Sequence, residues 1–286
     1  MSETPEKNAV VKKTLYLVST PIGNMSDITE RAIKVLSEVD FIAAEDTRKT
    51  GLLLNRLGIS SSLVSYYDHN KEEKGPRIIE RLKNGENCAL VTDAGTPAVS
   101  DPGEDLVKLA AENGITVVSV PGACAAISAL TVSGLSAGRF VFEGFLPADN
   151  KKRKQRYEEL SHEERTFIIY EAPHRIRKTL SELLSFLGDR RISLCRELTK
   201  LNEEIIRTTV SKAIALYEEK EPRGEYVLVI EGKQTITNAD YPEDVNDHVQ
   251  SLIESGLSRM DAIKAAAKQR GVPKSRIYDE YTGRNQ

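Results

Sequence analysis

The chain has 286 residues, of which 40% are hydrophobic and 29% are charged. This balance excludes a disordered chain, and at roughly 100 to 200 residues per domain the length predicts two domains. The 40 Lys and Arg residues and 43 Asp and Glu residues give a net charge of −3. The chain therefore lacks a global positive field, and any contact with RNA or DNA must be local.

Cysteine usage and hydropathy exclude further classes. Cys88, Cys124 and Cys195 stand singly in apolar runs, which argues against zinc sites and a disulfide framework, so we expect no metal. No apolar run approaches the roughly 20 residues that a membrane helix needs. Residues 1–13 are polar and lack a signal-peptide core. We therefore expect a cytoplasmic protein with no membrane partner.

Residues 14–134 alternate short β-branched runs with amphipathic segments, which is typical of βαβ units on a parallel sheet. The runs are apolar on both faces, as strands covered by helices on each side must be. Asp27 and Glu30 have the spacing of a capping box and predict a helix start. The expected strands are 15–19, 41–44, 63–66, 88–92 and 116–120, and further helices are expected at 77–83 and 105–113.

Residues 139–234 are predicted to form a second α/β domain, because the pattern restarts after a small-residue stretch at 135–138. Two consecutive strands without a helix between them predict a hairpin and a mixed sheet. Polar residues 235–241 are predicted to be a linker. The expected strands are 140–144, 166–170, 192–198, 204–210 and 226–231, and the expected helices are 153–160, 176–187 and 212–219.

Residues 241–286 are predicted to form a helical segment. Ser258 is placed as a helix cap, and Gly271 followed by Pro273 ends the helix. The apolar stripe of this helix is expected to comprise Leu257, Met260, Ile263 and Ala267.

Three loops rich in small residues follow strands of the first predicted sheet, at 19–24, 93–103 and 121–126. Ligands in open α/β sheets bind beyond the carboxyl ends of the strands. Each loop alone is explained by ordinary turn chemistry, but three on one rim predict a ligand site. Neither G-x-G-x-x-G nor G-x-x-x-x-G-K-[ST] occurs, which argues against a nicotinamide Rossmann enzyme and a P-loop NTPase.

The loop sequences at 93–97, 100–103 and 120–122 resemble the cofactor loops of the tetrapyrrole methylase superfamily, two-domain enzymes that use S-adenosylmethionine. Stretches 19–24, 44–48, 144–147, 170–175 and 196–200 resemble its branch of bacterial small-subunit rRNA cytidine 2′-O-methyltransferases. The resemblance runs from about residue 15 to residue 232 and is looser after residue 238.

The resemblance implies an α/β, two-domain tetrapyrrole-methylase-like fold, with a parallel-sheet first domain, a mixed-sheet second domain and a small helical C-terminal segment. It also implies methyl transfer from S-adenosylmethionine to the ribose 2′-hydroxyl of a cytidine in the decoding region of small-subunit rRNA, within the assembled 30S subunit, by a homodimer. The cofactor would lie between the domains, and its expected contacts are Pro21, Gly23, Asp93, Gly95, Thr96, Pro97, Val99, Ser100, Pro121, Gly122, Ala123, Ala126, Tyr170 and Glu171.

Such a transfer needs alignment of the reacting atoms and a group that accepts or orients the hydroxyl proton. The candidates are Glu45, Asp46, Asp93, His174, Glu197 and Lys200. Each has a structural alternative: the first two can cap the next helix, His174 can satisfy backbone groups, and Glu197 with Lys200 can be a surface ion pair.

Two basic runs, at 151–156 and 259–276, are candidate RNA contacts, although such runs are usually solvated helix faces. The predicted RNA-binding residues are Arg48, Arg175, Arg196, Lys151, Lys152, Arg153, Lys264, Lys268 and Arg270. Two other functions stay open, a methylase of a tetrapyrrole precursor and a non-catalytic RNA-binding protein. The basic runs and stretch 44–48 favour RNA, and the intact cofactor loops disfavour a non-catalytic protein.

Overall fold

The computed structural model describes residues 9–234 and 241–283. The chain divides into two compact units, residues 1–233 and 234–286, and each is described by itself. Within the described residues, no helix is long and apolar enough to cross a membrane.

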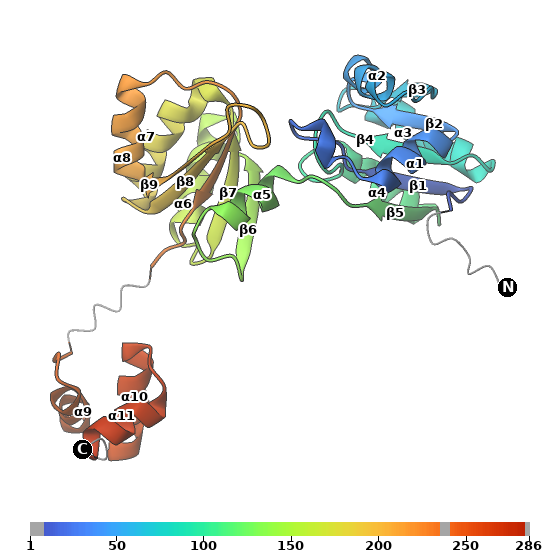
Figure 1. The fold of residues 1–286 in the computed structure, drawn as a ribbon. Coiled ribbons are helices and arrows are strands. Elements are labelled where there is room, and N and C mark those ends of the chain that lie inside the picture. The colour runs from blue at the N-terminus through green and yellow to red at the C-terminus, as the bar shows by residue number, and fades with distance from the viewer. Residues whose placement is uncertain (1–8, 235–240, 284–286) are drawn as a thin grey trace. The chain divides into compact units, whose positions relative to one another are not determined.

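The first sheet is five-stranded and parallel, in the order β3-β2-β4-β1-β5 (Figure 1). All five strands were predicted, and their ends differ from the prediction by at most one residue. They are β1 (Thr14–Val18), β2 (Phe41–Ala44), β3 (Leu63–Ser65), β4 (Cys88–Val91) and β5 (Thr116–Val120).

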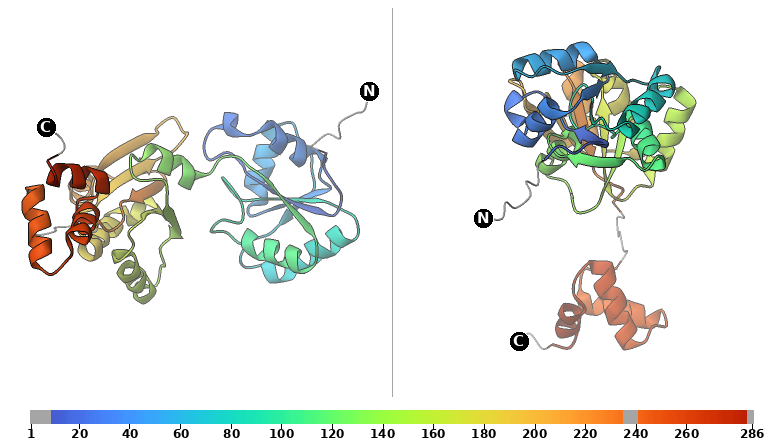
Figure 2. Two further views of the ribbon diagram at one scale, coloured as in Figure 1. Left: turned by 90° about the horizontal axis from the view of Figure 1, so that it is seen from below. Right: turned by 90° about the vertical axis from the view of Figure 1, so that its right-hand side faces the viewer.

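Helices cover both faces of this sheet, as Figure 2 shows. On one face, α1 (Glu30–Glu38) and α2 (Thr47–Arg56) pack against alternate strand residues such as Ile42 and Val91. On the other face, α3 (Lys71–Lys83) and α4 (Gly103–Glu112) pack against Phe41 and Leu90. Burial on two faces explains why the strands read as continuous apolar runs rather than alternating ones.

Two predicted helix starts were wrong. Thr29, not Asp27, caps α1, because its hydroxyl accepts the Ala32 amide at 3.1 Å, while residues 25–27 form a 3-10 turn, η1 (Met25–Asp27), capped by Asn24. Helix α3 begins at Lys71 rather than at residue 77 and contains Pro76. A proline six residues into a helix removes only one intrahelical hydrogen bond, which the packing of α3 outweighs.

The second sheet is five-stranded and mixed, in the order β6-β7-β10-β8-β9. β6 and β7 are parallel, and the other pairs are antiparallel, including the predicted hairpin β8–β9. The strands are β6 (Phe140–Phe145), β7 (Thr166–Glu171), β8 (Arg191–Arg196), β9 (Glu204–Thr209) and β10 (Tyr226–Ile230). The core on one face includes residues of α6 (Asn150–Ser161), α7 (Ile176–Leu187) and α8 (Val210–Glu219), and a short 3-10 helix, η2 (Pro173–Arg175), precedes α7.

Helix α5 (Ala125–Val132) covers the opposite face of the second sheet, where Ala129 and Leu130 pack with Ile168 and Val229. The domain limits 14–134, 139–234 and 241–286 stay predictions. The packing of α5 favours a first limit near residue 124, because this helix follows the first sheet in sequence and contributes its apolar residues to the core of the second.

Residues 245–281 form three helices, α9 (Val245–Glu254), α10 (Arg259–Arg270) and α11 (Lys274–Tyr281), around a small core. Ser258 caps α10, and Gly271 ends it in the left-handed region, both as predicted. The predicted apolar stripe was partly wrong. Leu257 and Met260 are 39% and 45% exposed, and the buried face of α10 is Ala262, Ile263, Ala266 and Ala267. Most of the predicted linker, residues 235–240, lies outside the described residues.

Candidate functional site

A cavity of about 620 Å³ lies at the carboxyl ends of β4 and β7, within the first unit. Its size is in the range of small-molecule sites. Loops from both sheets line it, so the ligand position expected for an open α/β sheet is met. Of the predicted site residues, the cavity brings together Glu45, Asp93, Gly95, Thr96, Val99, Ser100, Tyr170 and Glu171.

The cavity has a one-sided charge. Six carboxylates line it and no Lys, Arg or His does, among the described residues. Four of them are paired by cations outside the lining: Asp93 with Lys49, Asp68 with Lys71, Glu225 with Lys200, and Glu171 with Arg153 and Arg175. Glu45 and Asp101 have no such pair among the described residues, and a ligand that carries positive charge would complement them. The six are Glu45, Asp68, Asp93, Asp101, Glu171 and Glu225.

The loop after β4 owes its shape to backbone conformations that are rare for side-chain-bearing residues. Ala98 and Ser100 both have φ of 64°, in the left-handed region. The Asp101 carboxylate holds the loop by accepting the Ala98 and Gly103 amides at 3.0 and 2.7 Å. Burial raises the pKa of Asp101. Such strained positions persist only where the surroundings enforce them, and they concentrate at functional sites.

Direct contacts tie the three predicted loops together. Gly95, with φ of 84°, exchanges backbone hydrogen bonds of 2.9 and 3.0 Å with Thr20. The Thr96 hydroxyl accepts from Ser19 and donates to the Ala123 carbonyl, each at 3.0 Å. A Cβ on Gly122 would lie 2.9 Å from that of Ser19. Three segments far apart in sequence thus form one wall.

Not every predicted cofactor contact lines the main cavity. Gly122 and Ala123 line a neighbouring hollow that shares Ile22 and Cys124 with it. The prediction also included Pro21, Gly23, Pro97, Pro121 and Ala126, which line neither. A Cβ on Gly23 would overlap the Lys200 side chain, so this glycine lets the loop after β1 meet the loop after β8.

Tyr170 and Glu171, at the end of β7, differ in role. The Tyr170 hydroxyl accepts the Ala126 amide at 3.0 Å, and burial raises the pKa of this phenol to about 12. The Glu171 side chain is buried, accepts from Thr179, and pairs with Arg153 and Arg175 at 3.6 and 3.2 Å. Its carboxylate is therefore already engaged by the protein's own groups, and its role in cofactor binding stays a prediction.

The proton-transfer candidates on the first sheet differ in whether their carboxylates are already held by a cation. Asp46 caps α2, and its hydrogen bonds with Arg48 hold the pKa of this carboxyl far below its usual range, so it is a poor base. Asp93 is paired with Lys49. Glu45 accepts the Thr92 hydroxyl at 2.7 Å on Oε2, and its Oε1 has no hydrogen-bond partner among the described residues.

The candidates on the second sheet are less suited to proton transfer. Glu197 accepts the Glu225 amide and the Lys200 ammonium at 3.0 and 2.9 Å, and these bonds lower the pKa of its carboxyl. Lys200 is partly buried, but its bonds to Glu225 and Glu197 outweigh burial and raise its pKa. His174 is exposed in η2 and does not line the cavity, although Ala172 and Pro173 do. Glu197 and Lys200 thus form the ion pair that the sequence offered as their structural alternative.

The predicted RNA contacts fall into two groups, cations that are exposed and cations that the protein's own groups hold. Arg48 is 88% exposed, and Lys151, Lys152, Lys264 and Lys268 are exposed too. Arg153 is 3% exposed and bonds Glu182, Tyr157 and Thr179, which corrects its assignment as an RNA contact.

The other three predicted arginines are held by the protein itself. Arg270 donates to the carbonyls of Pro242, Glu243 and Asp244, so its guanidinium closes the helical unit on itself. Arg175 and Arg196 pair with Glu171 and Glu204.

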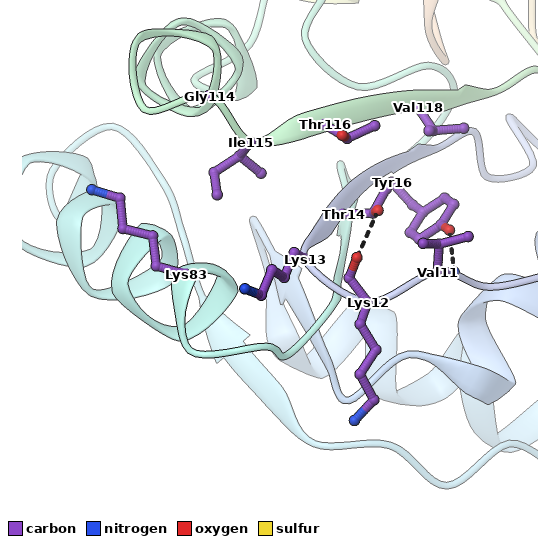
Figure 3. Close-up of a pocket in the computed structure, with 10 residues that line it drawn as sticks. All are labelled: Val11, Lys12, Lys13, Thr14, Tyr16, Lys83, Gly114, Ile115, Thr116 and Val118. Atoms are coloured by element: carbon purple, nitrogen blue, oxygen red, sulfur yellow. Dashed lines mark hydrogen bonds between the residues drawn. The ribbon is translucent and has the colours of Figure 1, made fainter.

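A separate hollow of about 420 Å³ lies at the amino ends of β1 and β5 (Figure 3). Lys12, Lys13 and Lys83 border it, but Lys12 directs its ammonium away from the other two. It lies at the end of the strands opposite to the one where ligands of open α/β sheets bind. No group of three or more His, Cys, Asp or Glu that could hold a metal occurs in the part of the chain that the structure describes.

The family described as Tetrapyrrole (Corrin/Porphyrin) Methylases matches residues 14–214 of the chain. The chain belongs to the tetrapyrrole methylase family. Curated relatives match this tetrapyrrole methylase over nearly its whole length. A protein of Halalkalibacterium halodurans, named Ribosomal RNA small subunit methyltransferase I, is 48% identical over 94% of this chain and 95% of its own. Proteins of the same name from Bacillus subtilis and Synechocystis are 48% and 46% identical, over 93% and 92% of this chain and 93% and 95% of their own.

Solved structures agree on the tetrapyrrole methylase fold. A uroporphyrin-III C-methyltransferase of Thermus thermophilus, complexed with S-adenosyl homocysteine, has a TM-score of 0.55 at 19% identity. The match covers 76% of this chain and 97% of the chain in that structure. A cobalt precorrin-4 methyltransferase has the same TM-score at 17% identity, over 76% and 94%. At these identities the likeness shows the fold alone.

The predicted cofactor and catalytic residues did not include several that line the cavity, among them Asp68, Asp101, Phe145 and Glu225. Asp68 and Phe145 lie at or just beyond the carboxyl ends of β3 and β6, so the rule that located the other loops would have found them. Glu225 precedes β10, and only the antiparallel pairing of β10 with β7 and β8 brings it to this edge.

Proposed function

We propose that this chain transfers a methyl group from S-adenosylmethionine to the ribose 2′-hydroxyl of a cytidine in small-subunit rRNA. The observation that carries the proposal is the acidic cavity at the carboxyl ends of the strands, in a chain 46–48% identical to relatives named for small-subunit rRNA. We place this activity in the cytoplasm, on the assembled 30S subunit and in a homodimer, as the resemblance implies.

The residues present fit the cofactor. S-adenosylmethionine has a sulfonium and an ammonium against one carboxylate, so its net charge is positive and matches a cavity lined by carboxylates. The Thr20 hydroxyl beside Gly95 is buried and has no hydrogen-bond partner among the described residues, although Thr20 itself does not line the cavity. The second lone pair of the Gly95 carbonyl would accept from a polar group of the molecule, and the ring of Tyr170 would contact its flat part.

When bound, the cofactor supplies a methyl group on a leaving group already activated by its positive charge. The chain must then align the acceptor oxygen and receive its proton. Glu45 is the best placed candidate, because it lines the cavity and its Oε1 has no hydrogen-bond partner among the described residues. Thr92 orients the carboxylate through Oε2.

A Glu45→Gln variant tests this role. We expect single-turnover methyl transfer to fall about 10²-fold to 10⁴-fold, with unchanged affinity for S-adenosylhomocysteine by calorimetry. Glu104→Gln, an exposed carboxylate in the first turn of α4, is the matched control and should keep full activity. Normal turnover in Glu45→Gln would rule out this residue as the proton acceptor.

The RNA would be held by cations outside the acidic cavity. Arg48, Lys151 and Lys152 are exposed in the first unit, and Lys264 and Lys268 in the second. Removing one cation that binds a phosphate should reduce the slope of log affinity against log salt by about 1. A Lys264→Gln/Lys268→Gln variant therefore binds 30S subunits less tightly and with a flatter salt dependence, whereas Lys108→Gln on α4 does not.

The deciding experiment uses S-adenosylmethionine labelled in its methyl group and 30S subunits from cells that lack the modification, with free 16S rRNA in parallel. Label in a cytidine ribose, located by nuclease digestion and mass spectrometry, supports the proposal. Label in a base contradicts the 2′-hydroxyl assignment. Transfer to uroporphyrinogen III and not to RNA would establish a small-molecule methylase, and binding of RNA without any transfer would establish a non-catalytic protein.

A further inference from the structure

Phe145, the last residue of β6, is an exposed aromatic side chain in the lining of the acidic cavity. It is 57% exposed, which is unusual for a phenylalanine at the end of a strand. Neither the cofactor loops nor the proton-transfer groups account for it.

A β-bulge directs this ring toward the cavity. The pairing of β6 with β7 shifts between Phe142 and Gly144, so that Glu143 is the extra residue. Side chains alternate between the faces of a strand, and one extra residue places Phe145 on the same face as Phe142. Both rings meet Tyr170 edge to face, at centroid distances of 5.1 and 5.6 Å.

Gly144 is required by this arrangement. Its φ is 64°, a conformation that the bulge imposes and that side-chain-bearing residues rarely adopt. A Cβ at this position would lie 2.6 Å from the Ser100 hydroxyl oxygen, in the loop after β4. The bulge therefore lets Gly144 approach the loop after β4, while Phe145, the next residue, lines the cavity.

We infer that Phe145 is a stacking platform for a nucleobase of the RNA substrate at or next to the methylated nucleotide. The inference rests on the proposed function. A ribose hydroxyl can enter the cavity only if its nucleotide is splayed from its neighbours, and aromatic side chains provide the surface on which such bases stack. Tyr170 and Phe145 meet in a T-shaped contact, and Phe145 still stays 57% exposed to solvent.

The exposure favours a substrate base over the adenine of the cofactor. Small-molecule sites bury about 70–90% of their ligand, so the side chains that hold it lie deeper than the rim. Tyr170 and Thr96 in the same lining are half-buried, whereas Phe145 is exposed.

The test compares four variants by steady-state methyl transfer to 30S subunits and by calorimetry with S-adenosylhomocysteine. Phe145→Ala should lower kcat/KM about 5-fold to 100-fold, mainly through KM for the subunit, with cofactor affinity within about twofold. Phe145→Tyr keeps a ring and should restore activity, whereas Phe145→Leu keeps apolar bulk without a π-face and should not. Phe140→Ala, at the other end of β6, is the control and should behave as the wild type.

Three outcomes would overturn the inference. Normal kcat/KM in Phe145→Ala would show that no base stacks there, and full activity in Phe145→Leu would show that only apolar bulk is needed. Equal reductions of cofactor affinity and of transfer would assign the ring to the cofactor. A wild-type protein that labels no RNA would instead overturn the proposed function, and the inference with it.

Discussion

The two sheets shape their sides of the cavity by different means. On the first sheet the wall is mostly backbone, with Gly95, Ala98 and Ser100 in left-handed conformations and small residues in contact. On the second sheet the wall is made of large side chains, such as Phe145 and Tyr170, and of ion pairs.

This difference has a physical consequence. A backbone wall has few side-chain atoms to remove, so it is sensitive to any atom added to it. A side-chain wall depends on the buried charges and hydrogen bonds that orient it, so it is sensitive to groups removed or protonated. Substitutions on the two sheets should therefore fail in different ways.

The largest expected effect is on the second sheet. Arg153→Met removes the buried guanidinium between Glu171 and Glu182 and should lower the free energy of unfolding by about 3–5 kcal/mol, since carboxylates lose their partner in a buried site. Urea denaturation measures it. Lys154→Met on the same helix, an exposed cation paired with Glu158, should change stability by less than about 1 kcal/mol. Equal effects in the two variants would mean that the buried network does not stabilise this wall.

On the first sheet, Gly95→Val should weaken cofactor binding in addition to straining the backbone. A branched side chain at φ of 84° costs on the order of 1–3 kcal/mol, and its Cβ would approach Ile22 at 3.3 Å. We expect affinity for S-adenosylhomocysteine to fall about 5-fold to 150-fold by calorimetry. Gly114→Val, at a similar φ of 66° with no atom within 4 Å of its Cβ, controls for backbone strain and should keep the affinity. A Gly95→Val protein with full affinity would refute the role of this loop.

The smallest effect concerns pH on the second sheet. The hydrogen bond from the Glu225 amide and the pair with Lys200 lower the pKa of Glu197 below its ordinary value of 4.5. Its contribution is therefore fully present above pH 4.5 and is lost as the pH falls through the lower folded-state pKa.

Exchange protection of the Glu225 amide, followed by NMR from about pH 6 to about pH 3, should drop over this window by the equivalent of about 1 kcal/mol. Glu197→Gln keeps an acceptor without the charge and should flatten the dependence. Protection that does not change with pH in the wild type would show that the ion pair does not hold this loop.

Local sequence patterns determined the strands, because apolar runs bounded by turn residues need no knowledge of their partners. They also located the loops after β1, β4 and β5, since a strand end is a local feature. They failed at Asp27, where two polar residues compete for one cap, and at Leu257 and Met260, where the buried face of α10 depends on α9 and α11.

Only the tertiary structure decided the roles of side chains whose partners lie far along the chain. Arg153 reads as one cation of a basic run, yet packing of α6 on α7 buries it against Glu182 and Glu171. Glu171 reads as a residue at the rim of the cavity, yet the same cluster occupies its carboxylate. Phe145 lies just beyond the predicted strand 140–144, and only the bulge at Glu143 places it on the same face as Phe142 and in the lining of the cavity. Burial and charge pairing are properties of contacts between distant segments, so no local pattern in the sequence encodes them.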